Sequence, residues 1–510
     1  MAAGGLIDII SRDAGGVPSG SDATLNLGGA IIGRLAGSAV PTSSANVQIT
    51  ANIFQPSAII YVNTTGTIDI LPFDDSFGEA FSTASKLRVN SDAGGAPSAL
   101  TIGTTNNIAN VTLANTISIN GPIEVYGGVI TTSSPVTSAG AITLMGSRVL
   151  VNSSLTSTGT GDILLQANTD SNSSIELASS SSVLKTGGAA STLTIKGVSR
   201  VSAWTGSTIS GSVGSPLNVI FWSDYDGDGG DGGVSAQATI ATYGGHVWMG
   251  GSDTVNGSEQ WNGLTVGDGA SEAGYGYNWN AIDLRSPSIT TSGGDIWVRA
   301  GEGYSNGLDG ITIYGDVYLD TGSGDITLEG DAVHQINAAY DIIIADNTTG
   351  VLTIKPYTND WSSYGTVVDI SGTFTGTRYQ GDVDFAEFQI NDVPDLGGLI
   401  IGKPGTNVGV KFYDALQVNG PIEAYGTYVW AVGDLTSTNG GMTLVSDQFI
   451  RFDGSLSATG DILMKSVGAK GVGNSDGWIY LFQNQSITTS GAQSDIVFWT
   501  NSANLTSGAG

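Results

Sequence analysis

The sequence of 510 residues has no cysteine, only two histidines and few basic residues, with 17 Lys and Arg against 46 Asp and Glu. The absence of cysteine excludes disulfides, cysteine metal sites and thiol catalysis. The formal net charge of −29 repels phosphate backbones and anionic lipid surfaces. We therefore expect no nucleic acid among the partners, and expect cations instead.

Long apolar runs are also missing. No stretch reaches the ~18 apolar residues of a membrane span, and residues 1–16 lack the basic region and apolar core of a signal peptide. We therefore predict no membrane insertion in this segment. Either the protein is intracellular, or the chain is a mature segment or fragment whose export signal lies elsewhere.

The composition favours strands and tight turns. Charged residues make up 12% of the chain, about half the ~25% usual for soluble domains, whereas there are 76 glycines. Good helix formers are scarce, and short runs of Val, Ile, Thr and aromatic residues alternate with Gly, Asn and Asp. This pattern excludes a mostly helical protein and predicts an all-β fold.

A long internal repeat runs through the chain. Residues 100–127 align without gaps with residues 399–426, and both contain Asn-Gly-Pro-Ile-Glu. The upstream residues 63–66 return as residues 347–350. We predict three segments: a partial repeat at 1–50, a full repeat at 51–335 with a loop insertion at 252–284, and a truncated second repeat at 336–510.

A third match concerns the ends of the chain. Residues 219–224 (VIFWSD) resemble residues 496–501 (IVFWTN) and, more weakly, residues 8–13. The chain thus begins and ends inside one motif, whereas stacked repeats need atypical units to cover their open ends. We expect these residues to be a window on a longer array.

A shorter period lies inside the long repeat. Strands of the type Gly-(Asp/Ala)-Ile occur at Ile142, Ile163, Ile296 and Ile326, and later at Met442, Ile462, Ile479 and Ile496. The first pair is 21 residues apart, and the last four are spaced by 20, 17 and 17. Such spacing predicts a parallel β-solenoid of 17–21-residue coils, with Gly at corners that need a positive φ. The alternative is a set of β-sandwich domains, which have turns every 8–12 residues.

The Gly-Asp-Ile strands, the two Asn-Gly-Pro-Ile-Glu blocks and the VIFWSD motif together resemble the filamentous-haemagglutinin-like giant repeat proteins of bacterial surfaces. The resemblance covers most of residues 50–510 and rests on repeat texture. It implies a secreted, right-handed parallel β-helix of the adhesin type at the cell surface, which serves adhesion, aggregation or matrix building. The secretion domain of such proteins has no recognisable counterpart here.

The strongest local signal is an acidic loop at residues 224–233. Its candidate ligands for calcium are Asp224, Asp226, Asp228 and Asp231, because Ca²⁺ gathers hard oxygens from alternate positions of a Gly-bent loop. It is not an EF-hand, since position 12 is Ser235. The alternative is an acidic turn that is only solvated.

A second candidate is the aromatic stretch at residues 259–280, which interrupts the coil spacing. Exposed rings on a Gly-rich loop can stack on sugars or pack against a partner, so these rings are candidate glycan or partner contacts. They are Trp261, Tyr275, Tyr277 and Trp279. The alternative is that they form a packed lid on the solenoid.

Catalysis has little support in the sequence. His246 and His334 lie 88 residues apart without metal-ligand spacing, and we expect Arg285 and Arg299 to be solvated. We therefore expect no enzyme but a structural protein, either a monomeric rod-like adhesin or a subunit that self-assembles head to tail or laterally into a surface fibre. Its partners would be other copies or glycans of host or neighbouring cells. The alternative is a β-helix carbohydrate-active enzyme, a polysaccharide lyase or hydrolase, with paired carboxylates and a basic residue in one groove.

Overall fold

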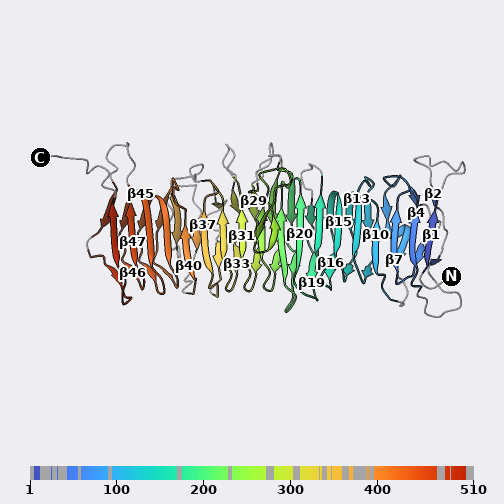
Figure 1. The fold of residues 1–510 in the computed structure, drawn as a ribbon. Coiled ribbons are helices and arrows are strands. Elements are labelled where there is room, and N and C mark those ends of the chain that lie inside the picture. Colours follow the sequence, from blue (N-terminus) through green and yellow to red (C-terminus); the bar gives the residue numbers. More distant parts are fainter. Residues whose placement is uncertain are drawn as a thin grey trace. The chain divides into compact units, whose positions relative to one another are not determined.

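The computed structural model describes most of the chain (Figure 1). The described residues are 5–11, 24–25, 31–32, 43–54, 59–89, 95–168, 175–227, 232–271, 281–301, 310–331, 333–335, 342–345, 347–358, 367–371, 387–389, 395–467, 477–482 and 484–500. They belong to two compact units. The first unit comprises residues 1–225 and 237–245, and the second comprises residues 226–236 and 246–510.

The first unit is a stack of three-sided coils whose strands pair in parallel. The first side consists of β1 (Leu6–Ile10), β4 (Asn46–Thr50), β7 (Thr67–Leu71), β10 (Ala99–Ile102), β13 (Ile123–Thr132), β15 (Ile142–Val151), β17 (Ile163–Ala167), β20 (Ser191–Gly197) and β23 (Leu217–Trp222). The second side consists of β8 (Phe81–Ser82), β11 (Val111–Leu113), the later halves of β13 and β15, β18 (Ile175–Leu177) and β21 (Arg200–Ala203). The third side consists of β12 (Ile117–Ile119), β14 (Val136–Ser138), β16 (Ser154–Ser157), β19 (Ser182–Lys185), β22 (Thr208–Ser210) and β25 (Thr239–Ala241).

Shorter elements complete the early coils of this unit. They are the strands β2 (Thr24–Leu25), β3 (Ile31–Ile32), β5 (Ile53–Phe54), β6 (Ile60–Val62) and β9 (Leu87–Val89), and the helix α1 (Thr83–Lys86). No helix in the described part of the chain is long and apolar enough to cross a bilayer.

The second unit repeats the same plan. Its first side consists of β26 (Val247–Gly250), β31 (Ile296–Arg299), β34 (Ile326–Glu329), β37 (Val351–Lys355), β40 (Gly398–Ile401), β43 (Ile422–Ala431), β45 (Met442–Phe452), β47 (Ile462–Ser466) and β50 (Ile496–Thr500). The second side consists of β24 (Gly233–Ala236), β29 (Ile282–Leu284), β32 (Ile311–Ile313) and β35 (Val333–Gln335), then β39 (Glu387–Gln389), β38 (Val367–Ser371), β41 (Gly409–Phe412) and β48 (Trp478–Leu481) beside the later halves of β43 and β45. The third side consists of β30 (Ser288–Thr290), β33 (Val317–Asp320), β36 (Ile342–Ile344), β42 (Leu416–Val418), β44 (Leu435–Ser437), β46 (Leu456–Ala458) and β49 (Ile487–Thr489).

The core lies inside the coils, because alternate residues of each strand point inward. One inward row shows how the sequence builds it. Val125, Leu144, Leu165, Ile195 and Phe221 pair strand by strand, and each is fully buried. The predicted all-β parallel β-solenoid is therefore confirmed.

Coil length is more variable than the sequence predicted. The 21-residue step from Ile142 to Ile163 is one coil, as expected. The predicted steps of 17 and 17 residues are wrong, because Ile479 pairs with Ile450 on the second side, whereas Ile496 pairs with Ile462 on the first. The segment from Ile462 to Ile496 is thus one coil of 34 residues.

Glycine is needed at the corners for two different reasons, backbone conformation and space. At Gly293, φ is +116°, the left-handed region that the sequence predicted for corners. At Gly121 the reason is space, because a Cβ atom would lie 1.8 Å from the carbonyl oxygen of Ser98 on the preceding coil. Close stacking of backbones therefore accounts for part of the glycine content.

Candidate functional site

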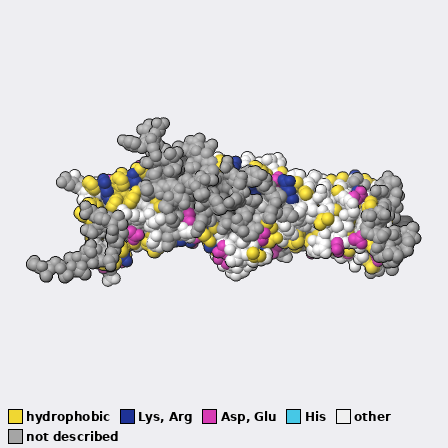
Figure 2. All heavy atoms as spheres, turned by 90° about the horizontal axis from the view of Figure 1, so that it is seen from above, with side chains coloured by type: hydrophobic (Ala, Val, Ile, Leu, Met, Phe, Trp, Pro, Cys, Tyr) yellow, Lys and Arg dark blue, Asp and Glu magenta, His cyan; other side chains and the backbone are white. Residues whose placement is uncertain are grey.

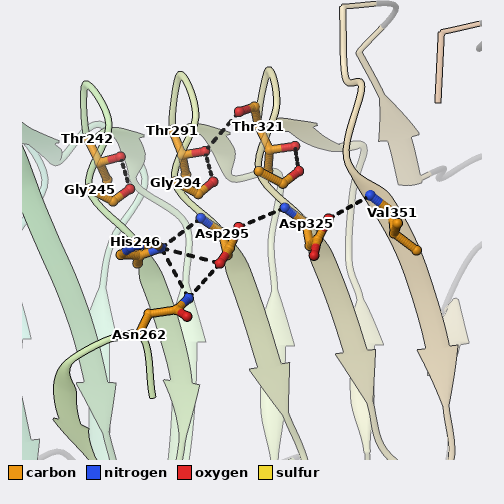
Figure 3. A network of polar contacts seen from close by, with 11 residues as sticks. Thr242, Gly245, His246, Asn262, Thr291, Gly294, Asp295, Thr321, Asp325 and Val351 are labelled. Carbon is orange, nitrogen blue, oxygen red and sulfur yellow. Dashed lines mark hydrogen bonds and ion pairs between the residues drawn. The ribbon is translucent and has the colours of Figure 1, made fainter. Parts of the chain in front are cut away.

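The Gly-Asp corners form a row of polar contacts between successive coils (Figure 3). The Oδ1 atom of Asp295 accepts the backbone N–H of Asp325 at 2.8 Å, and Asp325 Oδ1 accepts the N–H of Val351 at the same distance. Asp162 and Asp461 make the same contact to the next coil. At these four corners the repeated aspartate therefore satisfies a backbone donor, which is a structural role.

His246 occupies one position of this row. It directly precedes β26, as Asp295 precedes β31, and its Nδ1 atom accepts the N–H of Asp295 at 2.9 Å. A neutral ring that accepts at Nδ1 carries its proton on Nε2. The Nδ2 atom of Asn262 donates to Asp295 Oδ2 at 2.5 Å and lies 3.3 Å from His246 Nδ1 (Figure 3). His334 lies on β35, and its side chain is outside the described residues.

Asn262 belongs to a hairpin that leaves the coil path. The hairpin consists of β27 (Glu259–Trp261) and β28 (Leu264–Val266), which pair antiparallel within the predicted insertion. Its turn has positive φ at both Asn262 (49°) and Gly263 (77°), as expected for an Asn-Gly turn of type I′. The hairpin therefore owes its turn to a local sequence signal.

The hairpin lies against the outer face of β26 and β31. The half-buried ring of Trp261 lies 5.8 Å from the ring of Trp297 and 5.5 Å from that of His246, between ring centroids. Of the four predicted aromatic contacts, only Trp261 is described. Tyr275, Tyr277 and Trp279 lie outside the described residues, so the choice between a glycan contact and a packed lid stays a prediction.

Arg299 joins the hairpin to the coils through carboxylates. Its Nη1 atom lies 3.1 Å from Glu259 Oε1 on β27, and its Nε atom lies 3.9 Å from Glu329 Oε2 on β34. Glu329 also accepts from Trp297 Nε1 at 3.1 Å and lies 3.4 Å from Lys355 Nζ. This group of charged side chains gathers two carboxylates around one guanidinium.

The expectation of solvated arginines is wrong for Arg299, whereas Arg285 is 34% exposed but paired. The side chain of Arg299 is only 15% exposed. Arg285 Nη2 lies 3.1 Å from the buried Asp283 Oδ2, and its guanidinium lies 4.0 Å from the ring centroid of Tyr314. Asp283 lies only two positions before Arg285, but Tyr314, Glu259 and Glu329 are distant in the sequence, so a local pattern does not show those contacts.

Two further groups near Arg299 have raised pKa values. Burial raises the pKa of Asp253, and the neighbouring carboxylate of Asp268 raises it further. Burial also raises the pKa of Tyr357, which Arg299 counteracts in part. Asp268 accepts the hydroxyl of Thr254 at 2.7 Å.

The predicted calcium ligands are described only in part. Asp224 is buried with a φ of 47°, and Asp226 is half-buried. Asp228 and Asp231 lie outside the described residues. Among the residues that are described, no three acidic or histidine side chains gather closely enough to hold a metal ion. Calcium binding stays a prediction.

The two copies of the repeated block carry different outer faces. We call residues 100–151 with the adjacent strand β18 the first copy, and residues 399–452 with the adjacent residues 478–482 the second copy. Their inward rows are alike: Ile130 and Val149 in the first copy correspond to Val429 and Ile450 in the second, and all are buried.

One outward row changes its chemistry completely between the copies. In the first copy it reads Thr112, Thr131, Leu150 and Glu176. In the second copy the same row reads Lys411, Trp430, Arg451 and Tyr480. The neighbouring row changes from Val129 and Arg148 to Tyr428, Phe449 and Trp478.

These side chains of the second copy make one continuous surface, which we call the aromatic–cation face. Figure 2 shows hydrophobic and basic side chains gathered at the left of the view, toward the end where β45 and β47 lie in Figure 1. The face consists of Lys411, Tyr413, Tyr428, Trp430, Phe449, Arg451, Trp478, Tyr480 and Phe482.

Cation–π contacts organise this face. Lys411 Nζ lies 4.4 Å and Arg451 Cζ 4.3 Å from the ring centroid of Trp430. Because they sit on the strands to either side of β43, the two cations cover opposite faces of the indole. Arg451 also makes a bidentate pair with Asp453, at 3.0 Å for both contacts.

Comparisons with models of protein families, with curated proteins and with solved structures found no match to this chain. The resemblance to filamentous-haemagglutinin-like proteins therefore stays an expectation from repeat texture.

Proposed function

We propose that this protein is an extracellular structural repeat protein whose solenoid coils carry adhesive contacts on their outer surface, at the cell surface or in a matrix. One observation carries the proposal. The two copies of the block keep their buried inward rows but exchange a Thr-rich outward row for one of aromatic and basic side chains. A buried core that stays the same while outward side chains change is expected of a protein whose function depends on its outer surface.

The corner contacts fit the same role. At the corners of Asp162, Asp295, Asp325 and Asp461, the carboxylate satisfies a backbone donor of the next coil, so the stack contains repeated local contacts that tolerate changes on the outside. The polar outer positions, largely Thr and Ser, suit a surface that must stay soluble outside the cell. Secretion and the bacterial source remain expectations from the resemblance.

The test is an adhesion assay with the purified chain coated on beads. We expect coated beads to bind to cells or to polysaccharide matrix above the level of beads coated with an acidic globular protein of similar charge. Equal binding by both bead types, over several cell and matrix types, would contradict the proposal.

A second candidate function is a carbohydrate-active enzyme. The observation that favours it is the group around Arg299, where Glu259 and Glu329 approach one guanidinium beside Trp261 and Trp297. Release of reducing ends from polysaccharides, lost in Glu259→Gln, would support this candidate. Equal release by the wild type and the variant would remove it.

A further inference from the structure

We propose that the aromatic–cation face of the second copy is a self-association surface, and that its partner is a second copy of this chain. The inference rests on the proposed function, since it names one partner of the adhesive surface. It adds the location of that contact and the residues that dominate its affinity.

The composition of the face is that of a protein interface. Trp, Tyr and Arg are the residues most enriched among those that dominate binding energy at protein interfaces. Here they form adjoining rows on three consecutive strands, β43, β45 and β48. Tyr413, which lies on a coil inside the stack, is 42% exposed, so apolar ring surface is left in water.

The packing of the rings favours a protein partner over a sugar. A sugar ring stacks on the open face of an aromatic ring, but both faces of Trp430 are covered by Lys411 and Arg451. Tyr428 and Phe449 are stacked on each other, with centroids 5.0 Å apart and ring planes at 3°. What these rings present outward is mainly their edges, which pack against the irregular relief of another protein.

Charge identifies a second copy as a suitable partner. The face contains Lys411 and Arg451 in a chain that has 46 acidic and only 17 basic residues, and Asp453 offsets the charge of Arg451, so Lys411 gives the face its net positive charge. Acidic side chains are exposed elsewhere, as at Asp74 and Asp75 after β7. The face of one molecule is thus complementary to much of the surface of another.

Net charge also predicts how the association depends on salt. Two chains of −29 repel each other at long range, and the range of this repulsion falls from ~30 Å at 0.01 M salt to ~8 Å at 0.15 M. Apolar contacts are hardly weakened by salt, and charge contacts at a few ångströms are shorter than the ~8 Å screening length, so both lose less than the long-range repulsion does. We therefore expect self-association to strengthen over this range of salt.

The experiment exchanges residues between the copies. In Trp430→Thr/Arg451→Leu, the second copy receives the outward residues that the first copy carries as Thr131 and Leu150, which this scaffold is known to accept. Analytical ultracentrifugation from about 1 to 100 μM should show reversible association of the wild type and at least a tenfold weaker association of the variant. The matched control is Tyr318→Thr, which removes an exposed aromatic residue outside the face and should associate like the wild type.

Three results would overturn the inference. The wild type could stay monomeric at all concentrations and salts, the double variant could associate as strongly as the wild type, or Tyr318→Thr could weaken association as much as the double variant. Binding of alginate, a polyuronate, by a monomeric wild type but not by the double variant would assign the face to an acidic glycan instead. If bead adhesion persists while self-association is absent, only this inference fails and the proposed function stands.

Discussion

The Nδ1 atom of His246 accepts the backbone N–H of Asp295 at 2.9 Å, in the row where Asp295 Oδ1 accepts the N–H of Asp325 at 2.8 Å. An imidazole thus takes the place of a carboxylate in a repeated contact between coils. In this contact the ring nitrogen is the acceptor, the role that a carboxylate oxygen has at the other positions of the row.

Replacement of His246 tests whether this contact holds the corner. In His246→Leu the amide of Asp295 loses its acceptor, and an unsatisfied donor in a partly buried site costs about 1–3 kcal/mol. We expect faster hydrogen exchange at this amide, measured by mass spectrometry of the peptide that spans it. His246→Asp restores the residue type of the row and should keep the protection. Equal protection in the Leu variant and the wild type would show that the contact contributes nothing.

Corner glycines give a prediction about space. In Gly121→Ala the new Cβ would lie 1.8 Å from the carbonyl oxygen of Ser98, so a coil must shift, at a cost of about 1–3 kcal/mol. Gly420→Ala makes the same clash in the second copy, against Gly397. We expect both variants to lower the midpoint of chemical unfolding.

The control for these variants is Gly214→Ala. Gly214 has a φ of +76° but no atom within 4 Å of its added Cβ, so only backbone strain of about 1 kcal/mol is expected. If Gly121→Ala destabilises no more than Gly214→Ala, the preceding coil yields to the new Cβ atom, and close stacking does not require glycine at position 121.

The group around Arg299 predicts how the hairpin is held. Arg299→Leu removes the ion-pair partner of Glu259. Glu329, whose side chain is 9% exposed, also loses Arg299 but keeps its contacts with Lys355 and Trp297. We expect the hairpin strands β27 and β28 to exchange their amide hydrogens faster, while the coil strands β31 and β34 keep their protection.

The matched control is Arg285→Leu, which removes an arginine paired with Asp283, away from the hairpin. It should leave exchange in β27 and β28 unchanged. Unchanged exchange in Arg299→Leu as well would show that the aromatic contact of Trp261 with Trp297 is enough to dock the hairpin.

The fold was predictable because each strand and each corner has a local sequence pattern. The alternation of Ile, Val and Leu with polar residues, broken at Gly-Asp corners, indicated parallel coils before any pairing was known. Coil length was harder, because Ile462, Ile479 and Ile496 share one pattern although Ile479 belongs to another side of the coil. The pattern marks a strand but does not tell which side of the coil the strand forms.

The surface sites were less predictable, because they depend on residues from separate coils. In the sequence, Arg299 looks like an isolated arginine on a strand, because its partners Glu259 and Glu329 lie 40 and 30 positions away. The aromatic–cation face had a usable signal, since Thr131 in the first copy aligns with Trp430 in the second. Comparison of outward positions between copies would have found it.

Lys185 also breaks a repeated pattern. It follows Ser138 and Ser157 in one inward row of the third side, and all three are fully buried. Its ammonium donates to the carbonyl oxygens of Gly159 and Gly187. In an earlier coil, the hydroxyl of Ser138 donates in the same way to the carbonyl oxygens of Gly121 and Gly140. Burial lowers the pKa of Lys185 from its ordinary value of 10.5, and Asp162 offsets this in part.

This lowered pKa predicts a rise in stability with pH. Between the pKa of the folded state and 10.5, the unfolded chain binds more protons at Lys185 than the folded chain does, so the free energy of unfolding increases as pH rises through this window. Below the window the free-energy cost of burying the charged ammonium is present in full, and above 10.5 it is absent.

In Lys185→Ser, which restores the residue of the row, the pH-dependent contribution of Lys185 to the free energy of unfolding disappears. We therefore expect the difference in unfolding midpoint between wild type and variant to shift in favour of the wild type as pH rises toward 10.5, measured by urea unfolding at a series of pH values. A difference that stays constant across the series would mean that Lys185 has the same pKa in the folded and unfolded chains, and that its ammonium pays no cost of burial.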